Sequence, residues 1–148
     1  MHPGGFYVKI VVRHFTFDAI CEGHYVSGQI AGDACVGCKT VNIEAGRPSV
    51  EVALQRLSQE LRLGKANRVG ALKVIHGYGS TGSGGAIRDA ARRLLAERRR
   101  AGMIRDFVGG DEFSAFSPAG RRAVELLPEL RRDTDYGRGN DGLTIVVL

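Results

Sequence analysis

The chain has 148 residues, of which 43% are hydrophobic and 25% are charged, and this length suits one domain with room for a small appendage. The composition is too apolar for a disordered protein, and no apolar run approaches the roughly 20 residues that a membrane-spanning helix needs. Lys9 and Arg13 interrupt the apolar N-terminal stretch, which argues against a signal peptide. We therefore expect a soluble, cytoplasmic protein with no membrane partner.

The charge of the chain is unevenly distributed. There are 21 lysines and arginines against 16 aspartates and glutamates, which gives a formal net charge of +5. Residues 1–39 hold equal numbers of basic and acidic side chains, so the whole excess lies in residues 40–148. Most of the basic residues are arginines, whose guanidinium groups suit phosphate oxygens. This excess favours a polyanionic partner.

We interpret residues 1–39 as a small, β-rich N-terminal extension. Residues 6–17 are β-branched and aromatic, as in a strand or hairpin arm, whereas residues 19–40 are too poor in large apolar side chains to form a core. A tetrahedral structural zinc ion would stabilise such a segment. The candidate ligands are Cys21, His24, Cys35 and Cys38. A redox pair formed by the last two cysteines, or simple packing, are the alternatives.

The remaining chain, residues 40–148, has a regular alternation of elements. Residues 41–45 alternate as in a strand, and Ser49 is a plausible N-cap for a helix that follows. The apolar stripe of that helix starts at Val50, and Gly64 is placed to end it.

The second half of this domain contains two more strands, one long helix and a final strand. Residues 71–77 are almost continuously apolar, which indicates a central strand, and a helix follows over residues 84–101. Residues 104–109 and 143–148 predict strands on either side of an insertion at 110–142.

The insertion contains one clear element, a short helix that begins at Ser117-Pro118 and ends at Pro128. The order β-α-β-α-β-β predicts an α/β fold of the two-layer α+β sandwich type, in which helices pack on a mixed sheet.

A glycine-rich loop joins the predicted central strand to the next helix. Ligands bind at this place in open α/β sheets, and the free N–H groups at the start of a helix attract phosphate. The candidate nucleic-acid-binding residues are Gly77, Gly79, Ser80, Gly82, Gly84, Gly85, Arg88 and Arg92. No Lys-Ser/Thr pair follows the glycines, which excludes a Walker A loop, and a plain solvated loop is the alternative. A literal G-x-G-x-x-G at Gly137, Gly139 and Gly142 precedes a strand, so we interpret it as a turn.

The arginines of the helix at 84–101 and those between residues 121 and 138 form a second basic feature. Runs of this kind are often no more than a solvated surface, but their proximity to the glycine loop favours a phosphate backbone. Few aromatic residues lie among them, so stacking on bases has little support.

His76-Gly77-Tyr78-Gly79 at the end of the predicted strand and the terminal Gly142-x-Thr144 stretch resemble the small MutS-related (Smr) domain over about residues 40–148. This resemblance implies nucleic-acid binding and, in several members of the family, DNA nicking or RNA cleavage. His76, Gly77 and Gly79 match the HGxG motif of that family. The family's LDLHG motif appears here as residues 41–46, with Asn42 in place of the acid and no histidine, so any nuclease activity should be weak.

Three functions remain open at this stage. The first is nucleic-acid binding by the glycine loop and basic helix, with DNA and RNA both possible. The second is a divergent endonuclease, in which His76 acts as general acid or base while Glu44 and Asn42 help to hold a water molecule or a divalent metal ion. The third is a small-molecule phosphate-binding protein that uses the same loop.

Overall fold

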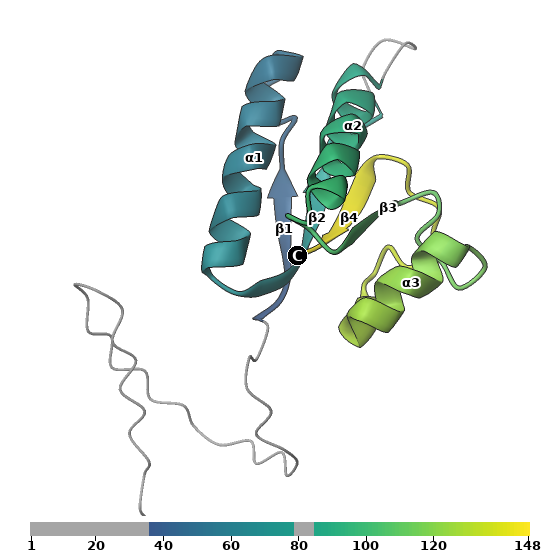
Figure 1. Cartoon of the computed structure of the whole chain (residues 1–148). Coiled ribbons are helices and arrows are strands. Elements are labelled where there is room, and N and C mark those ends of the chain that lie inside the picture. The colour runs from purple at the N-terminus through teal and green to yellow at the C-terminus, as the bar shows by residue number, and fades with distance from the viewer. Residues whose placement is uncertain (1–35, 79–84) are drawn as a thin grey trace, which may run out of the picture. The chain divides into compact units, whose positions relative to one another are not determined.

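The computed structural model describes residues 36–78 and 85–148, and Figure 1 shows how their elements are arranged. The chain divides into two units, residues 1–31 and 32–148, and every described residue belongs to the second. The strand predicted at residues 6–17 lies outside the described residues. No helix within the described ranges is long and apolar enough to cross a membrane.

A four-stranded mixed sheet forms the centre of the domain, with the strand order β1-β2-β4-β3. Its strands are β1 (Val36–Asn42), β2 (Val69–Ile75), β3 (Asp106–Gly109) and β4 (Leu143–Val147). β1 is parallel to β2, whereas β4 is antiparallel to both of its neighbours, β2 and β3. The predicted central position of the strand at 71–77 is confirmed, because β2 lies between two strands, as does β4.

The first strand differs from its predicted range of 41–45. β1 pairs with β2 at Val36 and from Cys38 to Asn42, so it includes residues of the predicted N-terminal extension. The first half of β1 could not be predicted from hydrophobicity, because its Lys39 and Thr40 side chains are exposed. Val41 of β1 and the following Ile43 are buried in the core.

Helix α1 (Val50–Ala66) begins where the sequence predicted, since the Ser49 side chain accepts a hydrogen bond from the Val52 N–H at 3.3 Å. The predicted end at Gly64 is wrong, because this glycine lies inside the helix and faces the sheet. A Cβ atom there would lie 2.6 Å from the Leu148 Cδ1 atom. Gly64 therefore permits close packing of the helix instead of ending it.

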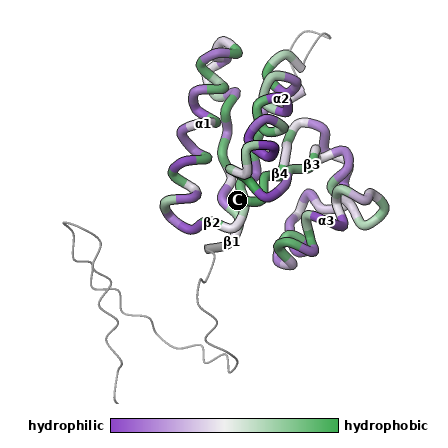
Figure 2. Tube along the Cα trace, viewed as in Figure 1, coloured by the Kyte–Doolittle hydropathy of each residue, from purple (hydrophilic) through white to green (hydrophobic). Residues whose placement is uncertain are grey.

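Helices α1 and α2 (Ala86–Arg100) cover one face of the sheet (Figure 1). Both are amphipathic, and Figure 2 shows hydrophilic and hydrophobic residues alternating along them. Leu57 of α1 and Leu95 of α2 are fully buried in one cluster with Leu72 and Val74 of β2 and Val146 of β4. Burial of a leucine contributes roughly 1.5–3 kcal/mol, so this layer supplies much of the folding free energy.

The predicted α/β class with a mixed sheet is confirmed, and the segment at 110–142 adds a cover to the second face of the sheet. Helix α3 (Pro118–Leu126) and a 3-10 helix, η1 (Pro128–Arg132), pack there on the opposite side chains of β2, β3 and β4. Phe113 and Leu130 anchor this layer and are almost fully buried. The segment is therefore part of the core, because the apolar residues on that face of the sheet require a partner layer.

An ion-pair cluster ties this second layer to the sheet. The Lys73 ammonium group of β2 lies 2.6 Å from Asp133 and 2.7 Å from Asp135, and all three side chains are largely buried. Burial alone would lower the pKa of Lys73, but the two carboxylates outweigh it and raise that pKa. The pair fixes residues 133–135 beneath β2.

Candidate nucleic-acid interface

The predicted site lies at the end of β2, where residues 76–78 meet the turn before β4. The backbone N–H groups of His76 and Gly77 both donate to the Gly142 carbonyl, at 3.1 and 3.0 Å. Gly142 therefore belongs to a turn, as the sequence indicated. This double contact holds the HGxG strand end against residues 140–142.

His76 is buried, with only 2% of its surface exposed, and both of its ring nitrogens have partners. Nε2 lies 2.9 Å from the Thr144 hydroxyl, and Nδ1 lies 3.1 Å from the Gly77 carbonyl. We assign the proton to Nδ1, which donates to the carbonyl, so that the Thr144 hydroxyl donates to Nε2. Burial lowers the pKa of His76, and the nearby Arg92 lowers it further, so the ring is neutral near pH 7.

The two arginines predicted to grip phosphate are bound to carboxylates of the chain itself. Arg88 and Arg92 both bind Asp141, and for Arg92 the distance to Oδ1 is 2.9 Å. Arg92 also lies 3.0 Å from Asp111, and Arg88 lies 3.0 Å from Asp89. Two guanidinium groups thus face three carboxylates, and the local charge is not positive.

The two strand-end residues predicted to assist catalysis have local structural contacts. The Asn42 side chain is exposed and its Oδ1 accepts a hydrogen bond from the Glu44 N–H at 3.0 Å, which forms the turn after β1. Glu44 lies against the backbone of Gly77, where a Cβ atom would be 1.9 Å from the carboxylate. Gly77 has a φ of +68°, so its lack of a side chain is required by both conformation and space.

The segment at 110–142 supplies side chains that the sequence analysis missed. Tyr78 donates to Asn140 Oδ1 at 2.5 Å, and the Asn140 amide in turn donates to Asp135 at 3.1 Å. Asp135 is a partner of Lys73, so one hydrogen-bonded chain runs from β2 to the exposed Tyr78. From the sequence, we interpreted Gly137, Gly139 and Gly142 as a turn and did not consider the Asn140 and Asp141 side chains between them.

The glycine loop is described only at its two ends. Gly77 and Gly85 flank it, and Gly85 is the N-cap of α2, with no side-chain hydrogen bond to that helix end. The other predicted loop residues, Gly79, Ser80, Gly82 and Gly84, lie outside the described residues. A phosphate contact of the loop therefore stays a prediction.

The zinc hypothesis also stays a prediction, because Cys21, His24 and Cys35 lie outside the described residues. Cys38 is an exposed free cysteine on β1. Desolvation of its thiol and the negative charge of Asp133 raise its pKa. Within residues 36–78 and 85–148, no three His, Cys, Asp or Glu side chains are grouped to hold a metal ion.

The aspartates and several surface arginines differ sharply in how they are paired across the described part of the chain. All six aspartates there form ion pairs. Asp106, for example, binds Arg99 at 2.8 Å and Arg122 at 3.4 Å, and these partners lower its pKa although its burial would raise it. By contrast, no described carboxylate pairs with Arg62, Arg93, Arg98 or Arg100.

The chain matches no protein-family model and no curated protein. Among solved structures, it is similar to the Smr domain of MutS2 from Thermus thermophilus, with 24% sequence identity. The match covers 74% of this chain and 96% of that one, with a TM-score of 0.46. The name of this structural neighbour is that of the family that the HGxG and C-terminal motifs resemble.

Proposed function

We propose that this domain binds nucleic acid through the phosphate backbone. The observation that carries the proposal is the pairing pattern described above, in which the described aspartates are all paired while Arg93 and Arg100 have no carboxylate partner among the described residues. Arg93 and Arg100 lie seven positions apart on α2 and so share one face of the helix. Each donates one hydrogen bond from Nε, Arg93 to the Asp89 carbonyl and Arg100 to the Ala96 carbonyl, so both guanidinium groups retain donors for phosphate.

Binding without efficient cleavage fits this geometry better than the nuclease alternative. A general base must be able to reach the proton that it removes, whereas His76 is 2% exposed and engaged at both nitrogens. The small-molecule alternative has less support as well, because the two predicted phosphate ligands on α2 face Asp141.

The proposal is tested by fluorescence anisotropy with single-stranded, duplex and branched DNA and RNA at several salt concentrations. The logarithm of the association constant should fall linearly with the logarithm of salt, by about 0.7–0.9 for each phosphate contact. No binding at low salt, or binding that mononucleotides displace as well as strands do, would refute it. The same samples incubated with Mg²⁺ should show little or no strand cleavage.

Two variants of α2 distinguish the loss of a phosphate contact from a general effect of mutating this helix. Arg93→Ala/Arg100→Ala should weaken binding and reduce the salt slope by about 0.7–0.9 for each lost contact. Glu97→Gln lies between them on α2, removes a negative charge and should strengthen binding. A loss of affinity in both variants would mean that the helix tolerates no change, and would leave the arginines without an assigned role.

A further inference from the structure

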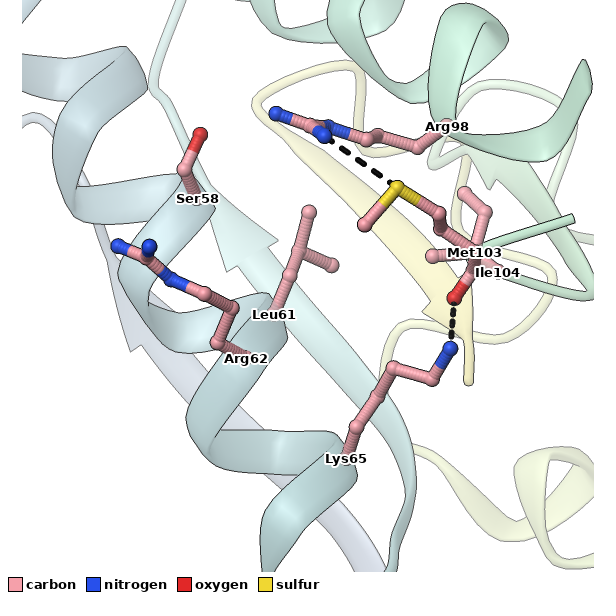
Figure 3. A pocket seen from close by; sticks show the side chains of 7 residues that line it. All are labelled: Ser58, Leu61, Arg62, Lys65, Arg98, Met103 and Ile104. Atoms are coloured by element: carbon pink, nitrogen blue, oxygen red, sulfur yellow. Dashed lines mark hydrogen bonds between the residues drawn. The ribbon is translucent and has the colours of Figure 1, made fainter. Parts of the chain in front are cut away.

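A second cationic feature lies between the C-terminal halves of α1 and α2. A pocket of about 230 Å³ opens there, and Figure 3 shows its lining. Ser58, Leu61, Arg62 and Lys65 come from α1, Arg98 comes from α2, and Met103 and Ile104 come from the turn before β3. We call this feature the α1–α2 pocket.

The α1–α2 pocket has three cations and no acidic residue in its lining. Lys65 donates to the Met103 carbonyl at 2.5 Å, and Arg98 contacts the Met103 sulfur at 3.3 Å, as Figure 3 shows. A thioether is a weak acceptor, so Arg98 retains most of its donors, and no hydrogen bond or ion pair of the Arg62 side chain is found among the described residues. Two guanidinium groups in the lining therefore keep donors for an anion.

The floor of the pocket is apolar. Leu61 and Ile104 are buried, and Met103 is 40% exposed beside them. The volume of about 230 Å³ lies below the roughly 300–1,000 Å³ of pockets that enclose drug-sized ligands, so a dinucleotide cofactor would not fit inside. One phosphate with its sugar is a better match in both size and polarity.

We propose that the α1–α2 pocket binds one phosphate–sugar unit of a nucleic-acid strand, with Arg62 and Arg98 on the phosphate and Met103 beneath the sugar. This inference rests on the proposed function and names a place on the domain where the backbone is held. A free inorganic anion would use the guanidinium groups but not the apolar floor, which is why a strand is the better occupant.

The occupancy of the pocket can be read from the oxidation of Met103, whose sulfur lies at its wall. Dilute peroxide converts methionine to its sulfoxide, and mass spectrometry of the Met103 peptide gives the rate. We expect a single-stranded oligonucleotide at saturating concentration to slow this reaction several-fold, while added free methionine in the same tube oxidises at its usual rate. Inorganic phosphate at the same phosphate concentration should protect much less.

Matched variants test the same contact by affinity. Arg62→Gln/Arg98→Gln removes two charges from the pocket, and Arg131→Gln/Arg132→Gln removes two exposed charges from η1. The pocket variant should lose about tenfold or more in affinity for the strand and lower the salt slope by about 1.4, whereas the η1 variant should lose clearly less. Circular dichroism should show both folded, since these side chains make no ion pair with a described carboxylate.

The outcomes separate this inference from the proposed function. Strand binding by the unmodified protein together with equal losses in the two variants and no protection of Met103 would overturn the pocket and leave the function standing. Protection of Met103 by inorganic phosphate as strong as by the strand would also overturn it. Failure of the unmodified protein to bind any nucleic acid would overturn both.

Discussion

The two ends of α2 carry similar arginines with different partners. Arg88, near the HGxG strand end, is bound to Asp141, whereas Arg98 in the α1–α2 pocket has a methionine sulfur as its polar contact. Ten residues separate them, which is about 15 Å along the helix. The comparison teaches that the position of an arginine beside a motif does not reveal whether a carboxylate neutralises it in the folded protein, because the partner can come from a distant segment.

The difference arises from the segment at 110–142. Its two ends deliver Asp111 and Asp141 to the N-terminal half of α2, and both pair with Arg92 there. In the C-terminal half of α2, Arg99 pairs with Asp106, whereas Arg98 faces the α1–α2 pocket, whose lining contains no acidic residue. Arg92 is thus held by the segment at 110–142, whereas Arg98 keeps most of its donors.

The largest effect should follow from disturbing the turn that carries Asp141. In Gly110→Ala, the new Cβ atom would lie 1.9 Å from the Asn140 backbone oxygen, which cannot move aside as a side chain can. We expect the free energy of unfolding to drop by about 3 kcal/mol or more in urea denaturation. Gly139→Ala is the control, since its φ of +65° costs about 1–2 kcal/mol but nothing lies near its Cβ position. Equal losses of unfolding free energy in the two variants would show that the turn can move to accommodate the new Cβ atom of Gly110→Ala.

A smaller effect should follow from removing the hydroxyl that joins His76 to Arg92. Thr144 is fully buried, and its oxygen lies 2.9 Å from His76 Nε2 and 3.5 Å from Arg92 Nε. Thr144→Val keeps the shape and should destabilise the fold by about 1–3 kcal/mol, because two polar groups lose a partner. Thr40→Val on the exposed side of β1 is the matched control and should change the free energy of unfolding by less than about 0.5 kcal/mol. Similar values for the two variants would show that this network contributes nothing.

A gradual effect should appear with pH. The pKa of His76 is lowered in the folded protein from its ordinary value of 6.5, so the unfolded chain takes up this proton first as the pH falls. The free energy of unfolding should therefore decrease below about pH 6.5 and level off, for this group, once the pH is below the folded pKa. His76→Gln should lack this component of the pH profile. An unchanged profile in the variant would show that His76 is not the group that titrates.

The sequence predicted the elements that local patterns encode. Ser49 and Ser117 cap α1 and α3 as expected, and the apolar run after residue 70 forms the interior strand β2. It did not predict the bounds of β1, whose exposed Lys39 and Thr40 are held in the strand by backbone pairing with β2. Strand pairing depends on a partner far along the chain, so a one-dimensional pattern records it poorly.

The sequence indicated which segments meet at the candidate site, but not which carboxylates pair with its arginines. The strand end, His76 and the start of α2 come together as the motif indicated. The carboxylates did not appear in that picture, because Asp141 lies 53 positions from Arg88 and 49 from Arg92. The α1–α2 pocket was missed for the same reason, since its arginines are distant in sequence and follow no motif.

The most direct test compares two single variants, Arg62→Gln in the α1–α2 pocket and Arg88→Gln at the strand end, by the salt dependence of binding to one oligonucleotide. Each removes one arginine from a helix, but only Arg88 is paired with carboxylates. The account predicts that Arg62→Gln lowers the salt slope by about 0.7 for a single strand and that Arg88→Gln changes it much less. A loss of slope in Arg88→Gln with none in Arg62→Gln would contradict it, and would place the phosphate at the glycine loop.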